Sequence, residues 1–210
     1  PVRKQVIARF PELADRTEVL LNFIDIKQVQ RRSEEPLSDP QYTGELKFLT
    51  VGRASEEKGY DIAVQITAEL KKRGLCFKWF IIGDGRDLNK LRTMAKEYQV
   101  EQEIIFLGMR ENPAPYVKSC DLYLQPSRHE GYPITIVEAR SLQKVIIASD
   151  IPSMREQIRD GENGYLCPLD VMQFADMADQ EGRDVVRKKL REEPIDFSAG
   201  YAQIEAFAKK

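Results

Sequence analysis

The sequence predicts an α/β fold, with a doubly wound, mostly parallel sheet of about six strands and C-terminal helices. The first observation is an alternation, from Leu46 onward, of apolar stretches of strand length with amphipathic stretches of helix length. The second is a set of continuous apolar runs, such as residues 145–148, which indicate strands buried on both faces of a parallel sheet. In such a sheet a ligand is expected at the carboxyl ends of the strands.

Residues 1–44 are expected to be a lead-in and linker ahead of the sheet. Residues 2–11 (VRKQVIARFP) can form a short helix. Residues 31–45 (RRSEEPLSDPQYTGE) are charged and contain two prolines and a glycine, so they predict a loop.

The predicted domain covers residues 45–195. Each predicted strand is an apolar run, and the runs lie at residues 46–52, 76–82, 103–108, 121–125, 144–149 and 164–167. Each predicted helix is amphipathic or short, and the helices lie at residues 59–73, 87–99, 114–119, 133–142 and 153–159. After Asp170 the chain is polar and helical, and residues 196–210 are expected to form a final helix.

The composition favours a soluble, globular protein: 210 residues suit one domain, with 42% hydrophobic and 31% charged residues. A net charge of −2 argues against electrostatic binding of nucleic acid. No apolar run is long enough to span a bilayer, and no secretory signal pattern is present. The cysteines, Cys76, Cys120 and Cys167, are widely spaced and form no metal-type cluster, which fits a reducing cytoplasm.

The segment Arg128–Ala139 (RHEGYPITIVEA) is the most informative stretch of the chain. It holds two carboxylates, Glu130 and Glu138, with a predicted turn and a helix start between them. Gly131 permits a tight turn, and Pro133 suits the first helical position, where an N–H group would have no intrahelical partner.

The amides of Ile134 and Thr135 would then lie at the positive end of a helix, where anions bind readily. Glu138 would follow just over one turn later, about 7 Å from the helix start. The order of carboxylate, anion cradle and carboxylate matches the sugar hydroxyls, diphosphate and ribose hydroxyls of a nucleotide sugar.

With Arg53 and Lys58 added, the chain resembles the C-terminal, donor-binding domain of the group 1 retaining glycosyltransferases, whose GT-B fold pairs two Rossmann-like domains. Residues 17–29 are similar to the family's connector into this domain, with Phe23 where glycine is usual. The ordered blocks that carry the resemblance are residues 48–65, 79–91, 104–109, 120–139 and 145–166.

The resemblance implies a role for each charged residue. Arg53 and Lys58 would bind the donor diphosphate and stabilise the departing nucleoside diphosphate. Glu130 would contact the hydroxyls of the donor sugar, and Glu138 would accept hydrogen bonds from the ribose hydroxyls. Arg53, Lys58 and Glu130 are therefore the expected catalytic set, and all four residues are expected to bind the donor.

The remaining expected donor contacts come from backbone groups. Gly83 and Gly85 would line the nucleotide pocket, although an ordinary strand-to-helix turn is an equal alternative. The turn at Met109 is the family's place for backbone contacts to the base. Arg110 beside it is expected to be a free surface residue, and a contact with the base or a phosphate is the alternative.

Pro133, where many relatives carry glycine, cannot donate, so the diphosphate cradle would use the backbone N–H groups of Ile134 and Thr135 or that of Tyr132. For the single histidine, His129, we expect a structural or peripheral role rather than a direct donor contact. For Asp150, Arg155 and Glu156 we expect sheet-edge capping and local salt bridges rather than a place at the rim of the pocket. No Asp-x-Asp pair is present, so donor binding is expected to need no metal and no cofactor.

The expected function is therefore donor binding in a retaining transferase that moves a hexosyl unit from a UDP-sugar or GDP-sugar to a glycan or lipid-linked acceptor, in cell-envelope polysaccharide synthesis. The chain begins at Pro1, so we expect an excised fragment that is inactive without its N-terminal acceptor domain. The full-length enzyme would be cytoplasmic or peripherally bound at the inner face of the membrane. One alternative is a non-catalytic partner module with the same fold. Another is a nicotinamide-dependent oxidoreductase, and the incomplete glycine fingerprint counts against it.

Overall fold

The computed structural model describes residues 2–19, 22, 24–44 and 46–180. These residues contain a sheet of six parallel strands in the order β3-β2-β1-β4-β5-β6. The strands are β1 Lys47–Val51, β2 Lys78–Ile82, β3 Ile104–Gly108, β4 Leu122–Gln125, β5 Val145–Ser149 and β6 Tyr165–Cys167. The strand order reverses between β1 and β4, which is the switch point where ligands bind in open α/β sheets.

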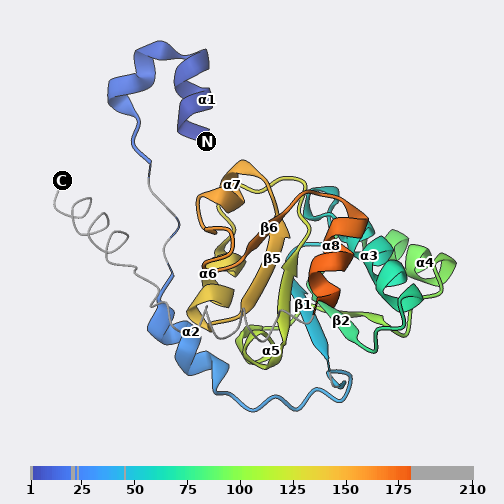
Figure 1. Cartoon of the computed structure of the whole chain (residues 1–210). Helices are drawn as coiled ribbons and strands as arrows, with labels where there is room; N and C mark the ends of the chain where they lie inside the picture. Colours follow the sequence, from blue (N-terminus) through green and yellow to red (C-terminus); the bar gives the residue numbers. More distant parts are fainter. Residues whose placement is uncertain (1, 20–21, 23, 45, 181–210) are drawn as a thin grey trace.

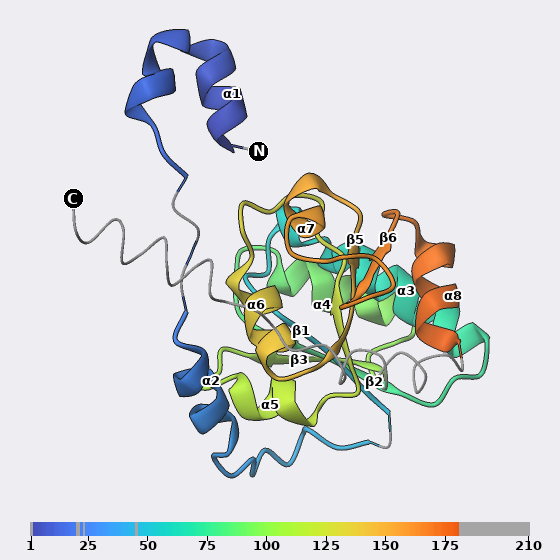
Figure 2. The same cartoon turned by 60° about the vertical axis from the view of Figure 1, so that its left-hand side comes forward.

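Helices cover both faces of the sheet, so the doubly wound prediction is confirmed (Figures 1 and 2). Helices α3 Tyr60–Lys72, α4 Leu88–Glu97 and α8 Val171–Asp179 pack on one face. Helices α5 Ala114–Ser119, α6 Ile134–Ser141 and α7 Pro152–Arg155 pack on the other. The predicted strands and most of the predicted helices agree with these bounds to within one or two residues, whereas α7 is shorter than predicted.

The sheet separates two apolar cores because neighbouring side chains on a strand point to opposite faces. Phe48 and Trp79 belong to the core under α3, and Leu49 and Phe80 belong to the core under α6. All four side chains are fully buried, which explains why the strands read as continuous apolar runs.

The lead-in contains more regular structure than the sequence predicts. Helix α1 Val2–Arg9 agrees with the predicted short helix, and a 3-10 turn, η1, follows at Pro11–Arg16. The loop predicted from residue 31 is wrong at its start, because helix α2 spans Ile26–Ser33. The Asp25 side chain accepts a hydrogen bond from the Gln28 amide and caps α2.

The linker after α2 lies against the face of the domain that carries α5. Tyr42 is buried between the rings of Phe80 and Tyr116, with centroids 4.4 and 5.0 Å away. The Arg32 guanidinium donates to the Glu111 carbonyl over 3.0 Å. The final helix predicted at 196–210 and the domain end predicted at 195 both lie outside the described residues.

Candidate functional site

The loops that follow β1 and β2 touch at the carboxyl edge of the sheet. Gly83 has a φ of +139°, and a Cβ placed there would lie 1.9 Å from the Gly52 carbonyl oxygen. The Gly52 amide donates to the Ile82 carbonyl, and the Ala54 amide donates to the Asp84 carbonyl, both over 2.9 Å. Glycine at position 83 is therefore what lets the two loops meet.

Gly85 makes a second close approach to the same loop, since its Cβ would lie 2.3 Å from the Ala54 carbonyl oxygen. Gly83 and Gly85 are thus what allow this strand-to-helix turn to approach the loop after β1 so closely. The contact of these glycines with a nucleotide stays a prediction.

The turn that carries Lys58 is fixed against the loop after β4. This turn is the 3-10 helix η2 Glu56–Lys58, and it ends at Gly59, whose φ is +66°. A Cβ at Gly59 would lie 1.9 Å from the Pro126 carbonyl oxygen, so the two loops meet here as well. The amides of Arg128 and His129 donate to the Glu57 carbonyl over 2.8 and 3.2 Å.

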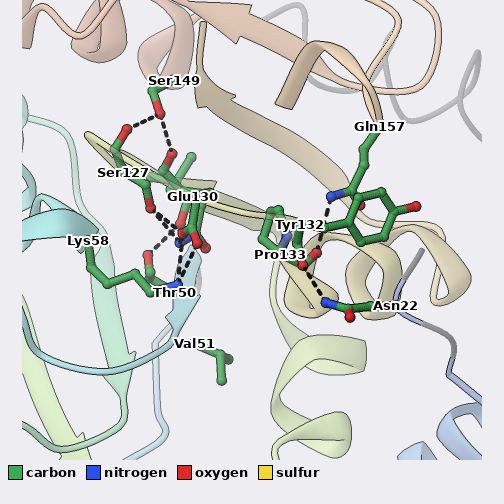
Figure 3. A network of polar contacts seen from close by, with 12 residues as sticks. Asn22, Thr50, Val51, Lys58, Ser127, Glu130, Tyr132, Pro133, Ser149 and Gln157 are labelled. Atoms are coloured by element: carbon green, nitrogen blue, oxygen red, sulfur yellow. Dashed lines mark hydrogen bonds and ion pairs between the residues drawn. The ribbon is translucent and has the colours of Figure 1, made fainter. Parts of the chain in front are cut away.

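Lys58 and Glu130, 72 residues apart in the chain, form an ion pair at this meeting point (Figure 3). The Lys58 Nζ lies 2.7 and 2.9 Å from the two carboxylate oxygens of Glu130. The side chain of Glu130 is only 8% exposed and that of Lys58 is 20% exposed. The cation and further hydrogen-bond donors around this carboxylate offset the cost of burying it.

Those further donors are buried polar residues that sequence reasoning missed. Ser127 Oγ and Gln125 Nε2 donate to Glu130 Oε1 over 2.7 and 3.1 Å, and both residues are fully buried. The only signal in the sequence is that Gln125 ends the apolar run of the β4 strand just before the Pro126 turn.

Two neighbouring strands hold the end of β4 in place. The Thr50 hydroxyl, on β1, donates to the Leu124 carbonyl over 2.6 Å, and the Ser149 hydroxyl, on β5, donates to the Ser127 carbonyl (Figure 3). The Trp79 indole N–H in turn donates to the Thr50 hydroxyl. The backbone that precedes Glu130 is therefore fixed from both sides.

Helix α6 begins one residue later than predicted. Pro133 is the N-cap residue with extended backbone (φ −71°, ψ 110°), so Ile134 is the first helical residue. No side chain caps this end, and its first turn contains no acidic residue. The amides of Ile134 and Thr135 accordingly have no acceptor within the helix and lie at its positive end.

The backbone leading into α6 is held by two amide side chains (Figure 3). Asn22 Nδ2 donates to the Tyr132 carbonyl over 3.1 Å, and Gln157 Nε2 donates to the Pro133 carbonyl over 3.4 Å. Asn22 belongs to residues 17–29, which resemble a family's interdomain connector, and it contacts the loop directly before α6.

Glu138 lies further along α6 in a different environment from Glu130. Burial raises the pKa of its carboxyl, and the charge of Arg32 lowers that pKa in part. Among the described residues, no side chain or backbone group donates a hydrogen bond to this carboxylate. Its charge also acts on the buried phenol of Tyr123, whose hydroxyl contacts Gln125.

The other predicted residues are spread around these loops. The exposed Arg53 makes no hydrogen bond or ion pair with the described residues. Hydrogen bonds, led by that from Ser55, lower the pKa of Glu57, and the charge of Arg53 makes a smaller contribution in the same direction. Met109 is 71% exposed at the end of β3, and Ile134 is 38% exposed. The structure thus brings Lys58 and Glu130 into contact and leaves Arg53 apart from them, while the Met109 carbonyl accepts from Arg110 over 3.1 Å.

The prediction that Arg110 is a free surface residue is wrong. Its guanidinium donates to Asp39 over 2.7 Å and to the Tyr116 hydroxyl over 3.0 Å. Asp39 lies in the linker, 71 residues away, so no local pattern could have paired them. The expected salt bridge between Asp150 and Arg155 is confirmed, with contacts of 2.5 and 2.8 Å, and His129 is exposed.

Comparison with known protein families matches most of the chain. The family model described as "Glycosyl transferases group 1" covers residues 32–184. An uncharacterized glycosyltransferase of Methanocaldococcus jannaschii is 29% identical over 170 residues, which are 79% of this chain and 40% of that protein. The N-acetylgalactosamine-N,N'-diacetylbacillosaminyl-diphospho-undecaprenol 4-alpha-N-acetylgalactosaminyltransferase of Campylobacter jejuni is 26% identical, over 80% of this chain and 44% of that protein. The chain therefore spans less than half the length of both relatives.

Solved structures share the fold. HepE of Anabaena, in complex with UDP, superposes with a TM-score of 0.75 at 19% identity, over 92% of this chain and 57% of that one. The C-terminal domain of the group 1 glycosyl transferase LpcC from Francisella tularensis gives a TM-score of 0.63 at 23% identity, over 83% of this chain and 91% of that one. In the described part of the present chain, no helix has the length and apolarity needed to cross a bilayer.

Proposed function

The chain belongs to the group 1 glycosyltransferase family, and from this premise we propose that it is the donor-binding domain of a retaining hexosyltransferase. The observation that carries the proposal is the Lys58–Glu130 pair, held at the sheet's carboxyl edge by the loop that leads into the uncapped end of α6. A cation, a buried carboxylate and free helix amides are the groups that a sugar diphosphate requires.

Each part of the site then has a distinct role toward the donor. Lys58 and Arg53 face the diphosphate, and the amides of Ile134 and Thr135 bind its oxygens. Glu130 accepts hydrogen bonds from the sugar, and Glu138 accepts them from the ribose. The groups that hold the diphosphate are all cationic or backbone amides, so we propose that donor binding needs no metal ion.

In the proposed reaction the bond between the anomeric carbon and the phosphate oxygen breaks, and its electron pair goes to the departing diphosphate. An acceptor hydroxyl attacks from the same face of the sugar, and its proton passes to an oxygen of that diphosphate. Lys58, Arg53 and the helix end stabilise the charge that develops there, while Glu130 holds the sugar in place.

The donor is a UDP-sugar or a GDP-sugar. The UDP in the HepE complex supports the first choice for a protein of the same fold. A glycan or lipid-linked acceptor fits the Campylobacter relative, whose name specifies a diphospho-undecaprenol acceptor. We propose that the acceptor binds mainly to a part of the enzyme outside this chain.

Isothermal titration of the chain with UDP and GDP tests donor binding, with a panel of UDP-glucose, UDP-N-acetylglucosamine and GDP-mannose to find the sugar. Arg53→Ala and Lys58→Ala should each weaken nucleoside diphosphate binding about tenfold. Arg92→Ala, which removes an exposed arginine from α4, is the matched control and should leave binding unchanged. The absence of any heat with both nucleoside diphosphates would contradict the proposal.

A further inference from the structure

The two carboxylate oxygens of Glu130 receive different numbers of hydrogen bonds from the protein. Oε1 accepts from Ser127 Oγ, Gln125 Nε2 and Lys58 Nζ, whereas Oε2 accepts only from Lys58. A carboxylate oxygen has about two acceptor positions, so Oε1 is fully used by the protein. Oε2 retains the capacity to accept a hydrogen bond from a ligand.

Gln125 is the least expected member of this set. It lies on β4, a central strand of the sheet, and its side chain is fully buried. A buried carboxamide on a central strand is costly unless its donors and acceptor are satisfied. Here its Nε2 donates to Ser127 Oγ over 2.8 Å and to Glu130 Oε1 over 3.1 Å.

The Glu130 carboxylate fixes the orientation of the Gln125 carboxamide, because a carboxylate only accepts hydrogen bonds and therefore faces the NH₂ end. Burial raises the pKa of the Tyr123 phenol well above its ordinary value, so the hydroxyl keeps its proton. That hydroxyl accepts from the Val51 amide over 3.3 Å, and its proton has two acceptors in reach, Gln125 Oε1 at 3.3 Å and the Val51 carbonyl at 3.5 Å. The carbonyl end of Gln125 therefore faces Tyr123, and the NH₂ end faces the carboxylate.

We propose that Gln125 is a positioning residue for donor-sugar recognition: together with Ser127 it occupies Glu130 Oε1, so that Oε2 is presented to a hydroxyl of the donor sugar. This inference rests on the proposed function. It assigns to Gln125 no contact with the donor, because the residue is fully buried behind Glu130. Its effect should fall on the sugar and spare the nucleotide.

The variant Gln125→Met keeps the length of the side chain and removes both of its hydrogen-bonding ends. The affinity for the nucleotide sugar that the wild-type chain binds best should fall about tenfold, while the affinity for the corresponding nucleoside diphosphate should change less than twofold. Glu130→Gln should show the same selective loss. Gln125→Met combined with Glu130→Gln should lose no more than Glu130→Gln alone, because both changes act through one carboxylate.

Two further variants separate positioning from general loosening of the fold. Ser127→Ala removes the other uncharged donor to Oε1 and should reproduce the selective loss, even if Gln125→Met folds poorly. Thr67→Val removes a buried hydroxyl on α3 that donates to the Ala63 carbonyl over 2.8 Å, far along the chain from Glu130. It should lower stability without changing the ratio of sugar to nucleotide affinity.

A measurement without ligand tests the contact itself. The side-chain amide resonances of Gln125, assigned by their loss in Gln125→Met, should shift in the NMR spectrum of Glu130→Gln and not in that of the exposed control Glu97→Gln. Equal sugar and nucleotide losses in Gln125→Met, or no loss, would overturn the positioning role while leaving the proposed function in place. A wild-type chain that binds nucleoside diphosphates but gains no affinity from any attached sugar would overturn the inference, and a wild-type chain that binds neither would overturn the proposed function as well.

Discussion

Replacing Gly83 by alanine should destabilise the domain by about 3 kcal/mol, as a combination of backbone strain and lost hydrogen bonds. The residue has a φ of +139°, which an L side chain rarely adopts. A Cβ would lie 1.9 Å from the Gly52 carbonyl oxygen, far inside the 3.0 Å that real contacts respect. The strained backbone costs roughly 1–2 kcal/mol, and parting the loops breaks one or two backbone hydrogen bonds worth about 1 kcal/mol each.

Gly74→Ala is the matched control, because Gly74 also has a positive φ of +77° but a Cβ there would meet nothing within 4 Å. It should lose only the backbone strain, about 1 kcal/mol. Urea unfolding of the two variants and the wild type gives both free energies, and Gly83→Ala should be the less stable by about 2 kcal/mol. Equal stabilities would refute the reasoning that contact between the loops after β1 and β2, rather than φ, requires glycine at position 83.

Three other substitutions test the charged groups of the domain. Lys58→Met should lower the free energy of unfolding by about 2 kcal/mol in urea titrations, because it leaves the 8% exposed Glu130 carboxylate without its cation. Burial raises the pKa of Glu138 above the usual 4.5, so its protonated form stabilises the fold below pH 4.5 and that contribution is lost as the pH rises through the raised value. Glu138→Gln should therefore gain stability relative to the wild type between pH 4 and pH 7.5 in thermal melts. Burial alone would raise the pKa of Asp39, but hydrogen bonds, led by that from Arg110, outweigh it, so the pKa lies below its ordinary value. Arg110→Met should therefore lower the free energy of unfolding by roughly 2 kcal/mol at pH 7. The difference from the wild type should shrink as the pH falls through the lowered pKa of Asp39.

The sheet could be predicted from the sequence because the central strands are buried on both faces and every strand is largely apolar. Strands β1 to β6 match their predicted ranges to within two residues for this reason. The helices that cover the sheet were equally visible, since α3 and α4 each bury one face and leave the other polar.

Features that depend on distant partners could not be predicted. Helix α2 is polar and short, and only the Asp25 cap marks its start. The pairing of Arg110 with Asp39 joins residues 71 positions apart. The contact of Lys58 with Glu130 is of the same kind, and the resemblance to a family suggested only that both residues face one ligand.

The two carboxylates of the candidate site differ in the groups that surround them, and the difference bears on their proposed roles. Glu130 is surrounded by donors, so its position is set by the protein itself. Glu138 is half-buried, receives no hydrogen bond from the described residues and has a raised pKa, so its charged form is disfavoured by burial. Ribose hydroxyls that donate to Glu138 would relieve that cost, and the gain would appear as affinity for the nucleotide. On the proposed function, the rigidly held carboxylate therefore selects the sugar by geometry, while the unsatisfied one strengthens binding of the nucleotide common to many donors.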